Sequence, residues 1–248
     1  MKSDKVKVKV TNLTKRFGDL LVLDNISFNV MKGEFLCIVG PTGCGKTTFL
    51  NSLTKLYDIT AGEILIDNEP VDLRKHNIAY IFQEYSTMPW LKVEDNIKYG
   101  LKVKKLSKEE VQKRTDEVIE MVGLEEYRDY YPRQLSASML QRVVIARAFA
   151  VQPELLIMDE PYGQLDIELR FKLEDELLKL WEKTGTTVIF ITHNIEEAVY
   201  LGERVLVLTN KPTHIKEEIV NDLPRPRDIA SDKFIEMRNE ITDLIKWW

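Results

Sequence analysis

The first third of the chain alternates hydrophobic and polar residues in the manner of β-strands. Valine alternates with lysine over residues 6–10, and a similar alternation covers residues 26–30. A period of two predicts strands with one buried face. Residues 35–39 form a continuous apolar run, which is typical of a strand buried on both faces. The apolar runs at residues 64–66 and 78–82 predict further strands.

Between residues 84 and 150 the spacing of apolar residues becomes helical. Ser107 with Glu110 three positions later predicts a capping box at a helix start, and Gly123 predicts the end of that helix. A second helix is predicted over residues 138–150.

Strands and helices alternate again in the last third of the chain. Strand-like runs occupy three segments, residues 155–159, 187–192 and 204–208. Three polar residues predict helix starts, namely Asp166, Asn194 and Ser231. The last of these helices carries its apolar residues on one face, namely Phe234, Met237, Ile241, Leu244 and Trp248.

The order of these elements predicts an α/β fold in a single domain. We expect a core sheet from residues 1–83 and 151–230, with an antiparallel, strand-rich N-terminal part. A helical subdomain of residues 84–150 is inserted into this core, and residues 231–248 form a C-terminal helix.

Composition narrows the class of protein. The 248 residues include 35 Lys and Arg against 40 Asp and Glu, and 44% of them are hydrophobic. This balance excludes a disordered chain and gives no general attraction for nucleic acid. The chain has two cysteines, Cys37 and Cys44, without metal-ligand spacing, and no apolar run of the roughly 18 residues that span a bilayer. A globular protein of a reducing cytoplasm is predicted.

A phosphate-binding motif lies between a predicted buried strand and a predicted helix. It satisfies the pattern G-x-x-x-x-G-K-[ST]. Its residues are Gly40, Pro41, Thr42, Gly43, Cys44, Gly45, Lys46 and Thr47, followed by Thr48. The glycines let backbone N–H groups curl around phosphate oxygens, which also meet the positive end of the following helix. Lys46 is predicted to reach the β- and γ-phosphates of a nucleotide, and the Thr47 hydroxyl to bind Mg²⁺.

Further polar residues follow the predicted strands. Asp159 ends the run at 155–159 and Glu160 follows it. Beside a phosphate loop, Asp159 is predicted to hold magnesium and Glu160 to activate the attacking water as a general base. His193 ends another strand, at the carboxyl edge where α/β sheets bind ligands, and is predicted to contact the γ-phosphate. Gln83 likewise follows a strand.

Together these spacings resemble those of the ATP-binding subunit of an ABC transporter, nearly from end to end. Phe17, in KRFG, resembles the aromatic residue that stacks on adenine. Gln83 matches the glutamine loop, which implies a role in nucleotide and Mg²⁺ binding. Residues 161–166, PYGQLD, match the loop that crosses the dimer, which implies a nucleotide contact by Asp166. His193, in ITHNIEEA, matches the switch histidine. The resemblance implies the phosphate-loop ATPase fold of this family, with ATP and Mg²⁺ as ligands.

The family resemblance also implies partners. Two ATP-binding subunits, identical or different, dock head to tail around two ATP molecules and drive transmembrane permease subunits at the cytoplasmic face of the cell membrane. A solute-binding protein takes part indirectly. Residues 88–97, MPWLKVEDNI, and 223–228, LPRPRD, look like the branch that imports nitrate, sulfonates and taurine.

The helical region after Gln83 is expected to contact the membrane subunit. Residues 88–91 are expected to form part of that surface. The alternative is that Met88, Pro89 and Trp90 simply pack under a loop.

The signature loop departs from the family pattern. It reads Leu135-Ser136-Ala137-Ser138-Met139 where the family has Leu-Ser-Gly-Gly. Ser136, Ala137 and Ser138 are still expected to face the partner's ATP, and Ser138 is a candidate cap for the following helix. The two new Cβ atoms predict a strained or crowded loop if the family's conformation needs a positive φ there.

The resemblance predicts one function, and this departure leaves a second one open. The chain is expected to be the ATP-hydrolysing, energy-coupling subunit of an importer for a small solute. The alternative is an ATP-binding regulatory or weakly hydrolysing subunit that needs a heterodimeric partner. A DNA-repair or chromosome ATPase needs a long coiled coil or a basic face, and the sequence has neither. Adenylate kinase-like and GTPase interpretations give no reason for residues 135–142 or for His193. A nucleophilic Cys44 is disfavoured because its position is unconstrained in the phosphate motif.

Overall fold

The computed structural model describes residues 5–163 and 165–245, which form two compact units. One unit consists of Met1–His76 with Thr187–Trp248, and the other of Asn77–Thr186. The second unit is a wider segment than the predicted helical subdomain, because it includes two strands and a long helix as well. The predicted domain boundaries stay predictions.

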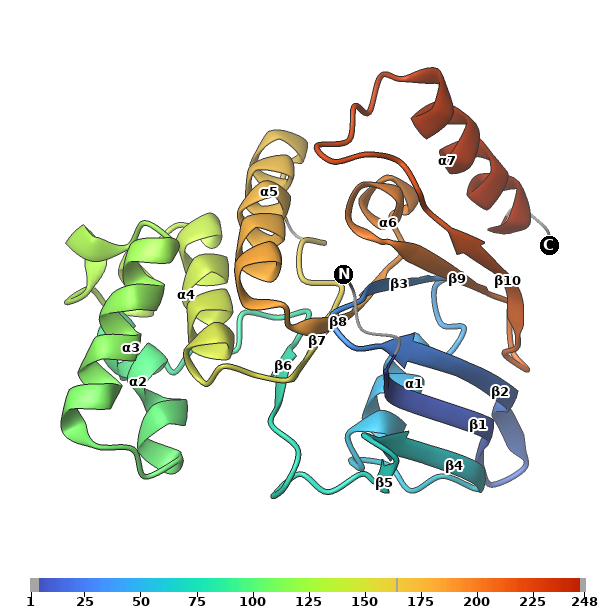
Figure 1. Ribbon diagram of the computed structural model, residues 1–248, viewed down its shortest axis with the longest axis horizontal. Coiled ribbons are helices and arrows are strands. Elements are labelled where there is room, and N and C mark those ends of the chain that lie inside the picture. The colour runs from blue at the N-terminus through green and yellow to red at the C-terminus, as the bar shows by residue number, and fades with distance from the viewer. Residues whose placement is uncertain (1–4, 164, 246–248) are drawn as a thin grey trace. The chain divides into compact units, whose positions relative to one another are not determined.

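Four strands of the first unit form an antiparallel sheet in the order β2-β1-β4-β5 (Figure 1). Their bounds are β1 Val6–Phe17, β2 Leu20–Met31, β4 Ala61–Ile66 and β5 Glu69–Pro70. Val8, Val10 and Ile66 are almost completely buried, as the alternating pattern predicts. The expected strand-rich N-terminal part is therefore confirmed.

The same unit contains three parallel strands in the order β9-β3-β8, with β10 antiparallel beside β9. Their bounds are β3 Phe35–Val39, β8 Thr187–Thr192, β9 Arg204–Leu208 and β10 Ile215–Val220. Every residue of β3 and β8 is buried, which explains their continuous apolar sequences. The bounds of β3, β8 and β9 match the predicted runs.

The described residues of this unit form three helices, namely α1 Lys46–Leu53, α6 Ile195–Leu201 and α7 Asp232–Ile245. Helix α6 contacts β3, β8 and α7 (Figure 1). Phe234 and Ile241 of α7 are buried, as the apolar face predicts. The helix follows Ser231 as expected, but the Ser231 hydroxyl donates to Asp228 O at 2.7 Å. The predicted position of Trp248 on this face lies outside the described residues.

Where the structure describes the second unit, it has two paired parallel strands and four α-helices. The bounds are β6 Ile78–Ile81, β7 Leu155–Asp159, α2 Val93–Val103, α3 Lys108–Met121, α4 Ala137–Ala150 and α5 Ile167–Thr184, with short 3₁₀ turns at Glu125–Tyr127 and Pro132–Gln134. Helices α2, α3 and α4 pack against one another (Figure 1). Over residues 5–163 and 165–245, each helix is too short or too polar to cross a membrane.

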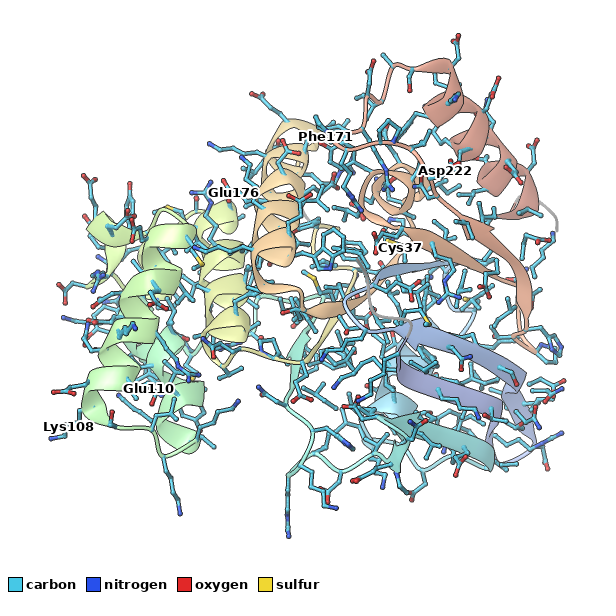
Figure 2. All side chains as sticks on the ribbon, viewed as in Figure 1. Cys37, Lys108, Glu110, Phe171, Glu176 and Asp222 are labelled. Carbon is cyan, nitrogen blue, oxygen red and sulfur yellow. The ribbon has the colours of Figure 1, made fainter. Side chains whose placement is uncertain are left out.

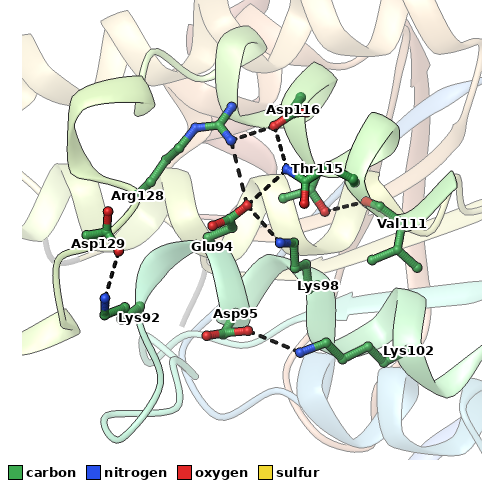
Figure 3. Close-up of polar contacts among 11 residues, drawn as sticks. Lys92, Glu94, Asp95, Lys98, Lys102, Val111, Thr115, Asp116, Arg128 and Asp129 are labelled. Atoms are coloured by element: carbon green, nitrogen blue, oxygen red, sulfur yellow. Dashed lines mark hydrogen bonds and ion pairs between the residues drawn. The ribbon is translucent and has the colours of Figure 1, made fainter. Parts of the chain in front are cut away.

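A polar cluster joins α2 and α3 on the surface of this unit (Figure 3). The Arg128 guanidinium contacts both Asp116 and Glu94, and Lys98 pairs with Glu94 at 2.8 Å. Ser107 caps α3 as predicted, because its side chain accepts the Glu110 N–H. The reciprocal half of the predicted capping box is not formed, since the Glu110 carboxylate accepts from Arg114 instead.

Candidate functional site

The phosphate loop lies between β3 and α1 and depends on its glycines. Gly43 and Gly45 have φ values of 76° and 119°, in regions that side chains strongly disfavour. A Cβ on Gly45 would also lie 3.0 Å from Val22 Cγ1. A Cβ on Gly40 would lie 3.0 Å from both Cys44 Sγ and Leu208 Cβ. The loop therefore holds a tight curve that larger residues would open.

Lys46 is buried inside this loop, with 5% of its surface exposed. Its ammonium donates to Gly40 O at 2.9 Å and to Pro41 O at 3.1 Å. A buried ammonium needs acceptors, and charged phosphate oxygens accept more strongly than these neutral carbonyls. Thr47, next to it, is exposed. The loop thus places a cation and an exposed threonine at the start of α1.

Cys44 is a packing residue of the loop. It is 1% exposed, and its carbonyl accepts from the Thr213 hydroxyl. Burial raises the pKa of the Cys44 thiol, although Lys46 opposes that shift. A raised pKa disfavours the thiolate that a nucleophile needs.

His193 lies at the same sheet edge as the phosphate loop. β3 and β8 are parallel, and Val39 is the partner of Thr192 in their register. Gly40 and His193 are the residues that directly follow this pair, so both lie at the carboxyl ends of their strands. The connection around His193 is firmly held. The Thr192 hydroxyl donates to Glu197 at 2.5 Å and accepts the Asn194 N–H at 2.9 Å. His193 itself is exposed.

Asn194 caps α6 as predicted. Its side chain accepts the N–H groups of Glu196 and Glu197. The cap fixes the helix start immediately after His193.

Phe17 lies at the end of β1 with 43% of its surface exposed. Tyr57 packs against it edge-to-face, with ring centroids 5.4 Å apart, and the Lys15 ammonium lies 4.6 Å from the Phe17 ring centre. An exposed, braced aromatic ring suits stacking on a base. Sequence reasoning missed Tyr57, because nothing in its local sequence shows that the chain after α1 returns to Phe17.

Gln83 and the acidic pair follow neighbouring strands in the second unit. β6 and β7 are parallel, and Ile81 is the partner of Met158. Gln83 is exposed, whereas Asp159 is only 7% exposed. Both therefore leave the same edge of this strand pair, as their positions after strands predict.

Two features of the acidic pair were not predicted. The Tyr80 hydroxyl donates to Asp159 Oδ2 at 3.4 Å, and burial together with the Asp159 charge raises the pKa of Tyr80, which keeps it a donor. Glu160 has a φ of 45°, a conformation that is rare for a residue with a side chain and is concentrated at functional sites. The apolar run at residues 78–82 contains Tyr80 but gives no sign that its hydroxyl bonds Asp159.

The loop after Glu160 leads into α5. Asp166 is exposed, and its side chain accepts the Leu169 N–H at 2.9 Å as the helix cap. Its expected contact with a nucleotide stays a prediction. Gln164 lies outside the described residues.

The signature loop corrects one expectation and resolves a second. Ser136, rather than Ser138, is the N-cap of α4, because the Ser136 hydroxyl accepts the Met139 N–H at 3.3 Å. Ser138 instead hydrogen-bonds Ser136 side chain to side chain at 3.0 Å. The condition for backbone strain is not met either, since Ala137 and Ser138 form the first helical turn and neither has a positive φ. Helical φ suits any L-residue, so these two substitutions introduce no backbone strain.

Residues 88–91 form a fixed turn before α2. The Asn96 side chain is fully buried and bonds the backbone of this turn: its oxygen accepts the Met88 N–H at 2.8 Å, and its amide donates to Met88 O and Leu91 O. Trp90 is 72% exposed. This exposure argues against the alternative that the turn is buried by ordinary packing.

Comparison with known proteins agrees with this geometry. Residues 23–163, more than half of the chain, match the family described as ABC transporter. An uncharacterized ABC transporter ATP-binding protein of Methanocaldococcus jannaschii is 46% identical over 98% of this chain and 92% of its own. The aliphatic sulfonates import ATP-binding protein SsuB of Bacillus cereus is 41% identical over 92% of this chain and 90% of its own.

Solved structures show the same fold. CbiO1 of Clostridium perfringens, part of the ABC transporter complex cbiONQ, aligns with a TM-score of 0.81 at 26% identity, over 94% of this chain and 93% of its own. The dimeric ATP-binding cassette MJ0796, in a post-hydrolysis state bound to ADP and Pi, aligns with a TM-score of 0.75 at 35% identity, over 86% of this chain and 98% of its own. The chain belongs to the ABC transporter family and is an ATP-binding subunit of the ATPase type, with ATP and Mg²⁺ as its ligands.

Proposed function

We propose that this chain is the energy-coupling ATPase subunit of an importer for a small solute of the nitrate, sulfonate and taurine class. The observation that carries the proposal is the 41% identity to a sulfonate import ATP-binding protein along 92% of the chain. The stretches at residues 88–97 and 223–228 support the same branch.

Each compact unit contributes its own part to ATP hydrolysis. In the first, Phe17 stacks on adenine, the phosphate loop from Gly40 to Thr48 binds the phosphates, and His193 contacts the γ-phosphate. The phosphate loop and His193 share one sheet edge, given by the pairing of Val39 with Thr192, which supports their two roles.

In the second unit, Glu160 is the general base, and Ser136, Ala137, Ser138 and Asp166 contact nucleotide. Asp159 and Gln83 are the residues of this unit that would hold Mg²⁺, and Thr47 is the proposed Mg²⁺ ligand of the first unit. Hydroxyl, amide and carboxylate oxygens are the ligands that Mg²⁺ prefers, and the depth of Asp159 fits a fixed ligand. When bound, the ion neutralises charge on the phosphates.

The chain works with a second ATP-binding subunit at the cytoplasmic face of the membrane. Unstrained residues at positions 137 and 138 support a second copy of this chain as that partner. Transmembrane permease subunits dock on the turn at residues 88–91, where exposed Trp90 supplies apolar contact.

A chromosomal Glu160→Gln substitution in the source organism tests this function. Uptake of labelled taurine, an alkanesulfonate and nitrate is measured in the wild type, in the variant and in a Glu154→Gln control. Glu154 is an exposed residue before β7, so its substitution matches the chemistry without touching the predicted base. Glu160→Gln is expected to lower uptake of one of these solutes by about 100-fold or more. Unchanged uptake of all three would overturn the proposed solute class.

A further inference from the structure

The segment 221–227, which contains all but the last residue of the LPRPRD stretch, closes the C-terminal end of α6 (Figure 1). The last four carbonyls of a helix lack partners within it. Ala198 O accepts the Gly202 N–H at 2.9 Å, in the usual way. The remaining three carbonyls accept from side chains of the 221–227 segment. Asp222, labelled in Figure 2, belongs to this segment.

Three side chains supply these bonds. Asn221 Nδ2 and Arg227 Nη1 each donate to Val199 O at 2.8 Å. Arg227 Nη1 also donates to Tyr200 O at 2.8 Å, and Arg225 Nη2 donates to Leu201 O at 2.5 Å.

The usual glycine cap is not formed at this helix end. Gly202 follows α6 with φ −73° and ψ 141°, whereas the common cap places its glycine in the left-handed region. A Cβ on Gly202 would lie 3.0 Å from Cys37 Sγ on β3 and 2.9 Å from Ala198 O, so the chain turns tightly against the sheet here. The helix end thus depends on donors from a distant segment.

Arg227 is specialised for this contact. It is 7% exposed, and in the described part of the chain each of its hydrogen-bond partners is a backbone carbonyl, on α6 or at Asn221 and Leu223. Burial of a guanidinium without a carboxylate is costly; burial and the neighbouring Arg225 lower the pKa of Arg227 to about 9. The negative end of the helix dipole offsets part of this cost.

The N-terminal end of α6, capped by Asn194, follows directly after His193. The helix has seven residues, and a helix so short is unstable by itself. Its first turn is tied to β8 through the Thr192–Glu197 bond, across the residue His193. A shift of α6 along its axis therefore moves the backbone that carries His193.

We propose that Arg225 and Arg227 are positioning residues for His193: they fix the far end of α6, and α6 fixes the imidazole that faces the γ-phosphate. This inference rests on the proposed role of His193. It also gives a physical reason for the LPRPRD stretch, whose arginines serve the ATPase site from the opposite end of a helix.

A double-mutant cycle tests the proposal with steady-state ATPase kinetics. Arg227→Gln is expected to lower kcat about tenfold and to change KM for ATP less than about twofold. In a His193→Ala background, Arg227→Gln is expected to lower kcat less than about twofold further, because the residue it positions is already gone. Arg227→Lys keeps the charge but loses the fork of donors, so its kcat is expected to lie between those of the wild type and Arg227→Gln.

Arg204→Gln is the matched control. Arg204 is a half-buried arginine of the same unit that bonds Glu34, Glu218 and Asn29 O and is not bonded to α6. Its effect on kcat is expected to be the same with and without His193.

Imidazole NMR gives a readout independent of turnover. The chain has three histidines, at positions 76, 193 and 214, so their ring signals are resolvable. Arg227→Gln is expected to shift or broaden the His193 signal and leave that of His76 unchanged. If Arg227→Gln does not fold, Arg225→Gln carries the same expectations.

The outcomes separate the two proposals. Unchanged kcat in His193→Ala overturns the role of His193 itself. A loss of kcat in His193→Ala, with Arg227→Gln acting fully in both backgrounds and an unmoved His193 signal, overturns the positioning role alone.

Discussion

The phosphate loop and the signature loop both lead into a helix, yet their backbones differ. α1 begins after Gly45, at a φ of 119°, where the loop has no room for a side chain. α4 begins after Ser136 in ordinary extended geometry and continues through Ala137 and Ser138 as a regular first turn. A glycine in a motif is therefore indispensable only where φ or a close contact demands it. In this chain the first loop demands it and the second does not.

The largest expected effect is at Gly45. Gly45→Ala is expected to destabilise the protein by about 3 kcal/mol, since it combines a disfavoured φ with contacts of about 3 Å to Val22 and Leu23. It is also expected to weaken ATP binding more than about tenfold. Urea denaturation and an ATP titration measure the two effects.

Gly185→Ala is the control for backbone strain alone. Gly185 has a φ of 63° at the end of α5, and a Cβ there would meet no atom within 4 Å. A cost of about 1 kcal/mol with unchanged ATP binding is expected. Equal ATP affinity in the Gly45 and Gly185 variants would show that the phosphate loop tolerates a side chain at position 45, contrary to this account.

A smaller effect separates capping from catalysis in the signature loop. Ser107 and Ser136 cap α3 and α4 with similar bonds, to Glu110 N at 3.2 Å and Met139 N at 3.3 Å. Each Ser→Ala substitution is expected to cost about 1 kcal/mol of stability. Only Ser136→Ala is expected to lower kcat as well, by about tenfold, because its hydroxyl faces nucleotide in the proposed dimer. Equal ATPase activity in both variants would reduce Ser136 to a helix cap.

The smallest expected effect concerns the stability of α3 in acid. The Arg128 hydrogen bond lowers the pKa of Asp116 below its usual 3.8. A lowered carboxyl pKa adds stability above the unfolded value, and this is lost as pH falls through the folded value. Amide exchange, corrected for intrinsic rates, is expected to show α3 losing more protection than α1 between pH 7 and pH 3. An Arg128→Met variant with the same pH dependence would contradict this role.

Local patterns predicted the elements that are buried on both faces. The runs 35–39, 155–159, 187–192 and 204–208 coincide with β3, β7, β8 and β9, because a fully buried strand leaves a continuous apolar run between turns. β10 escaped prediction, since Lys216, Glu217 and Glu218 break that pattern at the sheet edge.

The candidate site residues also divide into those that local patterns predict and those that they do not. The phosphate loop, Asp159 and His193 stand at strand ends, where the sequence pattern places them. Tyr57, Tyr80 and Arg227 gain their roles from contacts between segments far apart in the chain, which no local pattern encodes. The sequence left the conformation of residues 137 and 138 open, because a family consensus gives residue types and not φ values.

The most direct test of the account is the steady-state ATPase activity of the purified chain, compared with Glu160→Gln and with Ala137→Gly/Ser138→Gly. Because the signature residues sit unstrained in a helix, we expect the parent chain to hydrolyse ATP and Glu160→Gln to lose activity about 100-fold or more. The double glycine variant is expected to stay within about threefold of the parent and to unfold more easily, as glycine weakens a helix. A nearly silent parent chain that the two glycines restore to activity would contradict the account and favour a subunit that needs a different partner.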